Sequence, residues 1–270
     1  MYTLSNEQLT VSILNPLADQ SRFGVRYCTG GYIFQISDAR LGDLMSGPTY
    51  PDSFNWFDGQ GIPDAFNLHP LRDPKGSDET ALILGIGLCN LAERTVTEFC
   101  EWDVEQSSDA VRMTTRHDWQ GYDVTIERTV SLHERTVRSD TRLVNGGAPL
   151  PIRWFPHPFY PQTASDELLK LSIPVEVVEN PGYEMAPSGF IARKGWPWEQ
   201  GYYLALDHNA GRGLTIFQRH PLLGTVTATC SYDPTYFPIW GNPRTFSWEP
   251  FLERTIGGGL AAEWRIDYDF

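Results

Sequence analysis

Cysteine is scarce in this sequence and never closely spaced. The four cysteines, Cys28, Cys89, Cys100 and Cys230, form no C-x-x-C pair. Zinc ribbons and thiol–disulfide enzymes depend on such close pairs, so the cysteines indicate neither a structural zinc site nor a redox centre. We expect buried free thiols rather than disulfides.

Long apolar runs are also lacking. No uncharged stretch approaches the ~20 apolar residues that a membrane-spanning helix needs. Residues 1–7 lack the basic start followed by an apolar run that is typical of a signal peptide. These features predict a cytoplasmic protein with no membrane partner.

Basic residues are too few to balance the acidic ones. Lys and Arg number 21 against 34 Asp and Glu, which gives a net charge of −13. An acidic surface repels phosphate backbones, so we expect no nucleic-acid partner. A neutral small molecule would be indifferent to this field, whereas a phosphorylated one would need a local basic pocket.

Common catalytic and metal-binding motifs are missing. There is no G-x-S-x-G elbow, Walker loop or dinucleotide fingerprint. His133-Glu134 begins like H-E-x-x-H, but position 137 is Val. His117-Asp118 and Asp207-His208 are adjacent pairs, which on a strand point to opposite faces. We therefore predict no requirement for a transition metal.

Period-two alternation of apolar and polar residues is what the sequence does have. The clearest case is the closing segment, where the apolar positions are Leu260, Ala262, Trp264, Ile266, Tyr268 and Phe270. Such alternation predicts half-buried strands, and we expect the first five of these side chains to face the core. No segment of helical length shows a 3.6-residue period. A length of 270 residues suits one all-β domain, and we predict an antiparallel β-sandwich spanning residues 1–270.

Two proline-rich stretches break the strand rhythm, at residues 48–74 and 149–161. We interpret both as long irregular segments. Such segments are often functional in compact domains, although they can also simply cover the ends of sheets.

Two short segments place an ionisable residue directly before a proline. Phe155-Pro156-His157-Pro158-Phe159 follows a strand that ends in Val144-Asn145 and a glycine turn. Phe246-Ser247-Trp248-Glu249-Pro250 lies near the C-terminus. Proline restricts the preceding residue to extended backbone and removes a donor from the sheet. Both features favour a strand end that meets a cleft.

These segments, in this order, resemble the aldose 1-epimerase (galactose mutarotase) family. In that family a strand ending in asparagine leads to a His-Pro-aromatic motif, and a later strand carries a catalytic glutamate before proline. Residues Trp264–Phe270 are similar to the final strand of the family. The first hundred residues match poorly, which indicates a divergent member. The resemblance implies a galactose mutarotase-like β-sandwich, a small-molecule sugar as ligand and no cofactor.

The resemblance also implies which residues act. Glu249 would be the base that takes the proton from the C1 hydroxyl of the sugar, and His157 the acid that protonates the ring oxygen, so that the ring opens and recloses as the other anomer. A carboxylate and an imidazolium suit these two roles near neutral pH.

Further substrate contacts are assigned with less support from the motifs. The upstream arginine and histidine of the family are nearest to His69 and Arg72, and its aspartate to Asp207. Aromatic side chains stack on the apolar face of sugars, which adds as substrate-binding candidates Trp154, Phe159, Trp240 and Trp248.

Two other functions stay open at this point. A carbohydrate-binding or sensory module could keep the sandwich without turnover, since fold does not fix function. The poor match to the upstream arginine and histidine favours this alternative, whereas the His157 and Glu249 motifs favour the enzyme. A sugar lyase or hydrolase would need a second acid near Glu249, such as Asp233 or Glu253.

Overall fold

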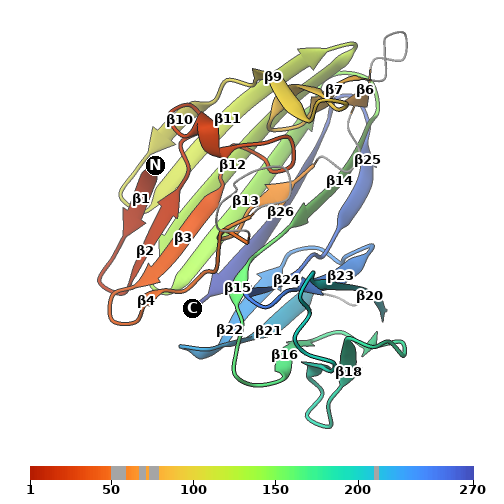
Figure 1. Ribbon diagram of the computed structural model, residues 1–270. Helices are drawn as coiled ribbons and strands as arrows, with labels where there is room; N and C mark the ends of the chain where they lie inside the picture. Colours follow the sequence, from red (N-terminus) through yellow and green to blue (C-terminus); the bar gives the residue numbers. More distant parts are fainter. Residues whose placement is uncertain (50–58, 67–70, 73–78, 210–212) are drawn as a thin grey trace.

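The computed structural model describes residues 1–49, 59–66, 71–72, 79–209 and 213–270 (Figure 1). Every paired strand within these ranges is antiparallel to its neighbour. The only helical element in the described part of the chain is a 3-10 turn, η1 (Gln20–Arg22). The predicted all-β, antiparallel sandwich is confirmed.

The largest sheet forms the broad layer of the molecule. Its order in the described chain is β10 (Asp103–Gln106), β11 (Ala110–Trp119), β12 (Tyr122–His133), β13 (Thr136–Asn145), β26 (Leu260–Asp269), β22 (Gly224–Cys230), β21 (Leu214–His220), β16 (Glu167–Leu171), β19 (Ile191–Arg193) and β18 (Tyr183–Met185).

Smaller sheets lie against this layer. The N-terminal sheet contains β1 (Tyr2–Ser5), β2 (Leu9–Ile13), β3 (Ile33–Asp38) and β4 (Gly42–Asp43). A second contains β6 (Leu71–Arg72), β7 (Thr80–Ile83), β8 (Gly87–Asn90) and β9 (Thr95–Phe99).

The last two sheets carry the segments that the sequence singles out. One has the order β25 (Leu252–Ile256), β14 (Leu150–Pro156) and β5 (Asp64–Ala65). The other has the order β15 (Tyr160–Pro161), β24 (Thr245–Trp248), β23 (Phe237–Gly241), β20 (Tyr202–His208) and β17 (Val175–Glu176).

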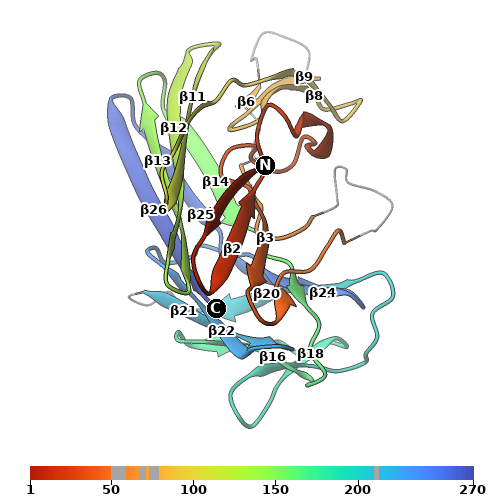
Figure 2. The same cartoon turned by 90° about the vertical axis from the view of Figure 1, so that its left-hand side faces the viewer.

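The core lies between the large sheet and the sheets packed on its inner face. Alternate side chains of β11 to β13, such as Met113, Ile126 and Leu143, are fully buried in one cluster with Val11 and Ile36 of the N-terminal sheet. Figure 2 shows β1 to β3 running beside the β11–β13 layer. Each such aliphatic side chain contributes roughly 1.5–3 kcal/mol through burial.

The alternation predicted for the last strand is confirmed for four of the five residues expected to face the core. Ala262, Trp264, Ile266 and Tyr268 of β26 are buried. The expectation for Leu260 is wrong, because its side chain is 60% exposed. Leu260 is the first residue of β26, and its amide closes the preceding turn by donating to the Gly257 carbonyl at 3.1 Å. Its side chain therefore lies outside the core, before Ala262, which is the first buried position of the strand.

The expectation of an irregular segment over residues 149–161 is only partly right. Residues Leu150–Pro156 form β14, which pairs with β25 over residues 150–154 and with β5 over residues 155–156. Over each stretch the strand is paired along one edge only, and prolines are tolerated at such edges. Within this stretch, irregular backbone is confined to Pro149 and to residues 157–159, after the strand has ended.

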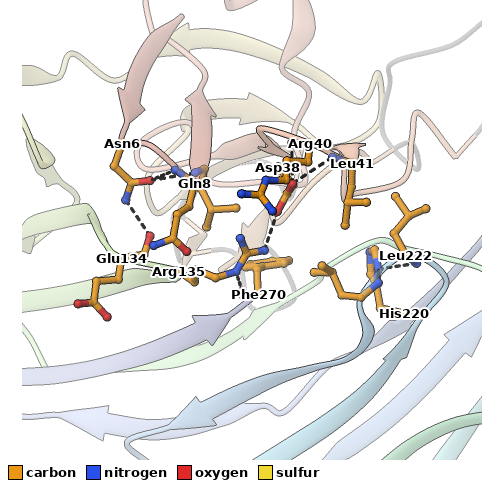
Figure 3. Close-up of polar contacts among 12 residues, drawn as sticks. Asn6, Gln8, Asp38, Arg40, Leu41, Glu134, Arg135, His220, Leu222 and Phe270 are labelled. Carbon is orange, nitrogen blue, oxygen red and sulfur yellow. Dashed lines mark hydrogen bonds and ion pairs between the residues drawn. The ribbon is translucent and has the colours of Figure 1, made fainter.

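The N-terminal sheet is joined to the large sheet by polar contacts at one end of the sandwich (Figure 3). Arg135, in the turn between β12 and β13, donates to Asp38 Oδ2 at 2.8 Å and to the Phe270 carbonyl. The Asn6 amide donates to the Glu134 carbonyl at 2.7 Å. His220 Nε2 lies 2.8 Å from the Leu44 carbonyl, which adds a contact from β21. These contacts fix the two layers beyond the edge of the apolar core.

All four cysteines are free thiols in the structure. Cys28, Cys89 and Cys230 are buried, and Cys100 is partly exposed. Burial raises the pKa of the Cys89 thiol to about 12, so this side chain stays a protonated, unreactive thiol at neutral pH.

Candidate functional site

His157 is held just past the end of β14. Its backbone amide donates to the Pro63 carbonyl at 2.8 Å, next to β5. Its ring stacks on Phe159 with centroids 4.4 Å apart and an interplanar angle of 19°. Because the backbone of His157 is hydrogen-bonded to Pro63 and its ring is stacked on Phe159, the imidazole has little freedom to rotate.

Glu249 is held in the same way after β24. Its amide donates to the Pro238 carbonyl of β23 at 3.0 Å, and Pro250 follows it. Glu249 Oε1 lies 3.1 Å from His157 Nε2, and each side chain is only 7% exposed. Two residues far apart in the sequence thus form a buried acid–base pair in direct contact.

Ser247 completes a chain of three polar side chains. Its Oγ lies 2.9 Å from His157 Nδ1, and Ser247 is fully buried. A serine hydroxyl can accept a hydrogen bond from Nδ1–H while Nε2 faces the carboxylate. In that arrangement Nε2 is the ring atom available for proton transfer.

The His157–Glu249 pair opens onto a cavity of about 430 Å³. Most of its walls are aromatic, and its lining residues are Arg26, Arg153, Phe155, His157, Phe159, Gln200, Tyr203, Tyr236, Trp240, Glu249 and Phe251. A concave site with mainly apolar walls and a few convergent polar groups is typical of small-molecule binding.

Three larger hollows, of about 570, 630 and 550 Å³, lie elsewhere, and the first two are beside Cys100. The first contains His117, but its Nε2 already accepts a hydrogen bond from the Gly85 amide at 3.0 Å. The described ion pairs in these hollows join exposed side chains, as Arg116 and Asp118 do at 3.8 Å, whereas the His157–Glu249 pair at the 430 Å³ cavity is buried. The smaller cavity is therefore the better candidate for chemistry.

Two of the predicted aromatic contacts do line this cavity. Trp240 of β23 stands edge-on to His157, with ring centroids 6.4 Å apart, and Phe159 is the ring on which His157 stacks.

The other two predicted aromatic contacts are wrong. Trp154 is 2% exposed and packs on Trp264 in the main core, and Trp248 is fully buried against Tyr268. Both errors have one cause, because neighbouring residues on a strand face opposite ways. Trp154 and Trp248 each differ by an odd number of positions from the cavity-facing His157 and Glu249.

Of the predicted polar contacts His69, Arg72 and Asp207, the structure describes the side chain of Asp207 alone. Asp207 is exposed on β20, about 13 Å along the strand from the cavity-lining Tyr203, and the expectation that it binds substrate is wrong. His69 lies outside the described residues. Arg72 ends β6, and its side chain is likewise outside the described part of the structure.

Sequence reasoning missed several residues that line the cavity, among them Arg26, Arg153, Tyr203 and Tyr236. Arg153 could have been found, because it shares the parity of Phe155 on β14 and of His157 just past the end of that strand. Arg26 lies in an irregular segment with no periodicity to exploit.

A pair of tyrosines forms part of the cavity wall. The two hydroxyls of Tyr203 and Tyr236 lie 2.5 Å apart. Burial, the contact with Tyr236 and the charge of Glu249 raise the pKa of Tyr203. This side chain therefore stays a neutral phenol that can donate a hydrogen bond to a polar ligand.

A second carboxylate does not join Glu249 within the described lining of the cavity. Glu253, one of the two acids that a hydrolase would need, pairs with Arg153 at 2.7 Å and is 39% exposed. The other, Asp233, is exposed and accepts a hydrogen bond from the Gly213 amide at 3.2 Å. This arrangement does not favour a two-carboxylate mechanism.

A buried ion pair includes Asp64, the residue after the Pro63 carbonyl that accepts the His157 amide. Arg128 of β12 contacts Asp64 of β5, and their side chains are 1% and 8% exposed. Burial raises the pKa of Asp64, and the adjacent guanidinium opposes that rise. Since Pro63 accepts the His157 amide, the ion pair anchors the backbone that holds the histidine.

Metal ligation has no support in the described chain. No group of three or more His, Cys, Asp or Glu side chains there could hold a metal ion. The described residues also contain no helix long and apolar enough to cross a membrane.

No protein-family model matches the chain, and no curated protein matches its sequence. Solved structures do match in fold. A galactose mutarotase related enzyme from Lactobacillus acidophilus superposes with a TM-score of 0.65 at 12% identity, over 99% of this chain and 96% of that one.

Two further structures agree. A galactose mutarotase-like protein from Lactobacillus casei gives a TM-score of 0.56 at 13% identity, over 100% of this chain and 99% of the other. A protein from Escherichia coli K12, provisionally titled an aldose 1-epimerase, gives 0.58 at 15% identity, with 99% and 97% covered. The chain therefore has the galactose mutarotase-like fold, in a form whose sequence has diverged far from these structures.

Proposed function

We propose that this protein interconverts the α and β anomers of a sugar by acid–base opening of the pyranose ring. The observation that carries the proposal is the contact of 3.1 Å between His157 Nε2 and Glu249 Oε1 at a cavity lined by aromatic rings. The fold shared with galactose mutarotase-related structures supports it.

Ring opening needs proton transfer at two oxygens that are bonded to the same carbon. Glu249 takes the proton of the C1 hydroxyl while the His157 imidazolium gives a proton to the ring oxygen, and the bond between C1 and the ring oxygen breaks. Because the two target atoms are neighbours, a base and an acid in mutual contact can reach both. The product of this step is the open-chain aldehyde.

Ring closure reverses the transfers. After the C1–C2 bond has rotated, the C5 oxygen attacks the other face of the carbonyl. His157 takes back the proton of the C5 hydroxyl, and Glu249 returns its proton to the carbonyl oxygen. Throughout the cycle Ser247 accepts the Nδ1–H bond, which keeps Nε2 as the reacting nitrogen. Protons balance over the cycle, and no cofactor is consumed.

The aromatic walls suit the apolar faces of a sugar ring. Trp240 and Phe159 line the cavity beside the catalytic pair. Both offer ring surface for stacking, and the Tyr203 phenol offers a donor to sugar hydroxyls.

The alternative of a binding module without turnover makes a different use of the same cavity. It accounts for the aromatic walls, but it gives no reason for a buried carboxylate in contact with an imidazole.

We further propose that residues 1–270 act as one domain in the cytoplasm, a location that the four free thiols support.

The experiment that tests the proposal is magnetisation-exchange NMR on a panel of aldoses at their anomeric equilibrium. Wild-type protein should accelerate exchange between the α and β signals in proportion to its concentration. A protein that binds a sugar of the panel without accelerating exchange would instead be a binding module.

A further inference from the structure

The cavity holds a positive charge that the proposed anomer exchange does not use. Arg26 lines the cavity, and no ion pair joins its guanidinium to any described carboxylate. Its Nε is buried without a hydrogen-bond partner, and its Cζ lies 5.4 Å from the ring centroid of Tyr27. The guanidinium is thus braced by an aromatic ring while its hydrogen-bonding capacity remains open.

The other arginine of the cavity differs in having a carboxylate partner. Arg153 is paired with Glu253 at 2.7 Å and lies over the ring of Phe251, 4.7 Å from its centroid. Its charge is largely compensated. Among the described lining residues, Arg26 is therefore the cation left for a ligand, in a protein whose net charge is −13.

From this geometry we infer that the sugar carries an anionic substituent, and that Arg26 binds it. This inference rests on the proposed function and names the substrate class of the same cavity. A guanidinium presents paired N–H donors that match the two oxygens of a carboxylate or phosphate, and such contacts are charge-assisted. An uncharged hydroxyl would leave most of this capacity unused.

The charge of the cavity distinguishes between a carboxylate and a phosphate ester as the anionic substituent. A phosphate ester carries close to two negative charges at neutral pH, whereas a carboxylate carries one. A single uncompensated guanidinium, in a cavity that also contains the Glu249 carboxylate, matches the smaller charge. The ligand that fits best is therefore a uronic acid, an aldose whose terminal carbon is a carboxylate.

The first experiment measures binding with glycosides that cannot open, so that it does not depend on turnover. Titration calorimetry would compare methyl glucopyranosiduronate, methyl glucopyranoside and methyl glucopyranoside 6-phosphate. Hydrogen bonds to charged groups predict that wild type binds the uronide about 10- to 100-fold more tightly than the neutral glycoside. Equal affinity for these two would overturn the inference. Tightest binding of the phosphate ester would overturn the assignment of a carboxylate.

Substitution of Arg26 tests the residue itself. Arg26→Gln should remove the preference for the uronide and leave affinity for the neutral glycoside within about twofold. Arg26→Lys keeps the charge but loses the planar fork, and should keep part of the preference. The two variants together also cover the case in which the glutamine protein folds poorly.

The matched control is Arg22→Gln. Arg22 lies four residues earlier, stands 4.7 Å from the ring centroid of Phe34 and does not line the cavity. The Arg22→Gln substitution removes an equivalent stacked charge outside the cavity. The preference for the uronide should therefore survive. If the control lost the preference as Arg26→Gln does, net charge rather than a specific contact would be the cause, and the inference would be wrong.

Exchange NMR on glucose, glucuronate and glucose 6-phosphate then separates the two proposals. Exchange of all three at equal efficiency would refute the anionic substrate but keep the mutarotase. A uronide preference that depends on Arg26, without accelerated exchange of any sugar, would keep the anion site and refute the enzymatic function.

Discussion

Removal of the carboxylate charge at position 249 is the sharpest test of the proposed chemistry. In the wild type His157 Nε2 lies 3.1 Å from Glu249 Oε1. Glu249→Gln keeps the size of the side chain and leaves a carbonyl oxygen that can accept a hydrogen bond from His157 Nε2. It eliminates only the ability to take a proton. A positioned general base contributes ~10²–10⁴-fold, which corresponds to an activation barrier higher by about 3–5 kcal/mol. We expect a loss of anomer exchange in that range.

His157→Asn tests the other half of the pair. The amide retains polar contact with Ser247 but cannot donate a proton to the ring oxygen as an acid. We expect a loss of similar size. The double variant should be little worse than the poorer single variant, because groups that act as one unit are strongly non-additive.

The assay is the exchange rate between anomeric NMR signals, measured at sugar concentrations below and above saturation. Sugar affinity and the denaturation midpoint should change little, since neither replacement removes an apolar wall. Glu263→Gln, at a carboxylate that is 69% exposed on the large sheet, is the control and should retain full activity. Acceleration that persists in both single variants would falsify the assignment of this pair.

Three further outcomes follow from the structure. Ser247→Ala should slow exchange about tenfold, because the His157 ring loses the hydroxyl that keeps Nε2 as the reacting nitrogen. Asp64→Ala should lower the free energy of unfolding in urea by about 3–5 kcal/mol, because it leaves Arg128 buried without its partner. Burial lowers the pKa of His117 to about 4, so the unfolded chain binds this proton first as the pH falls. Stability should therefore decrease between about pH 6.5 and pH 4 by roughly 3 kcal/mol, and His117→Gln should remove that part of the loss.

Each of these predictions has its own control. Ser247→Thr retains the hydroxyl and should restore most of the rate, whereas equal losses for both variants would point to packing. Glu127→Ala breaks an exposed ion pair with Arg112 and should cost no more than about 1 kcal/mol. His133→Gln, at an exposed histidine, should leave the pH dependence of stability unchanged. An identical loss in His117→Gln protein and wild type would show that other groups dominate.

Much of the fold could be predicted because period-two alternation depends on the sequence alone. Trp264 and Ile266 face the core as their spacing requires, and the strand breaks at glycine turns are local features. The prolines of β14 gave no sign of the strand, because tolerance of proline depends on which edge of a strand is paired. That information is tertiary and is not contained in the segment itself.

The site could be predicted only in part, for a related reason. His157 and Glu249 stand out through their proline neighbours, but nothing in either segment specifies that their side chains touch. Parity would have excluded Trp154 and Trp248 once the facing of His157 and Glu249 was assumed. Arg26 could not have been found, because an irregular loop brings it to the cavity and no repeat pattern marks its position.

The burial of the His157–Glu249 pair argues for chemistry over simple binding. Taking a carboxylate and an imidazole out of water costs several kcal/mol per charged group, and their mutual attraction often fails to exceed that cost. Well-packed apolar residues at both positions would serve stability equally well or better. A binding module would gain more from exposed donors than from two groups that satisfy each other. The proposed chemistry gives the pair a use that offsets this cost, because the sugar requires a proton at one oxygen and an acceptor for a proton at the next.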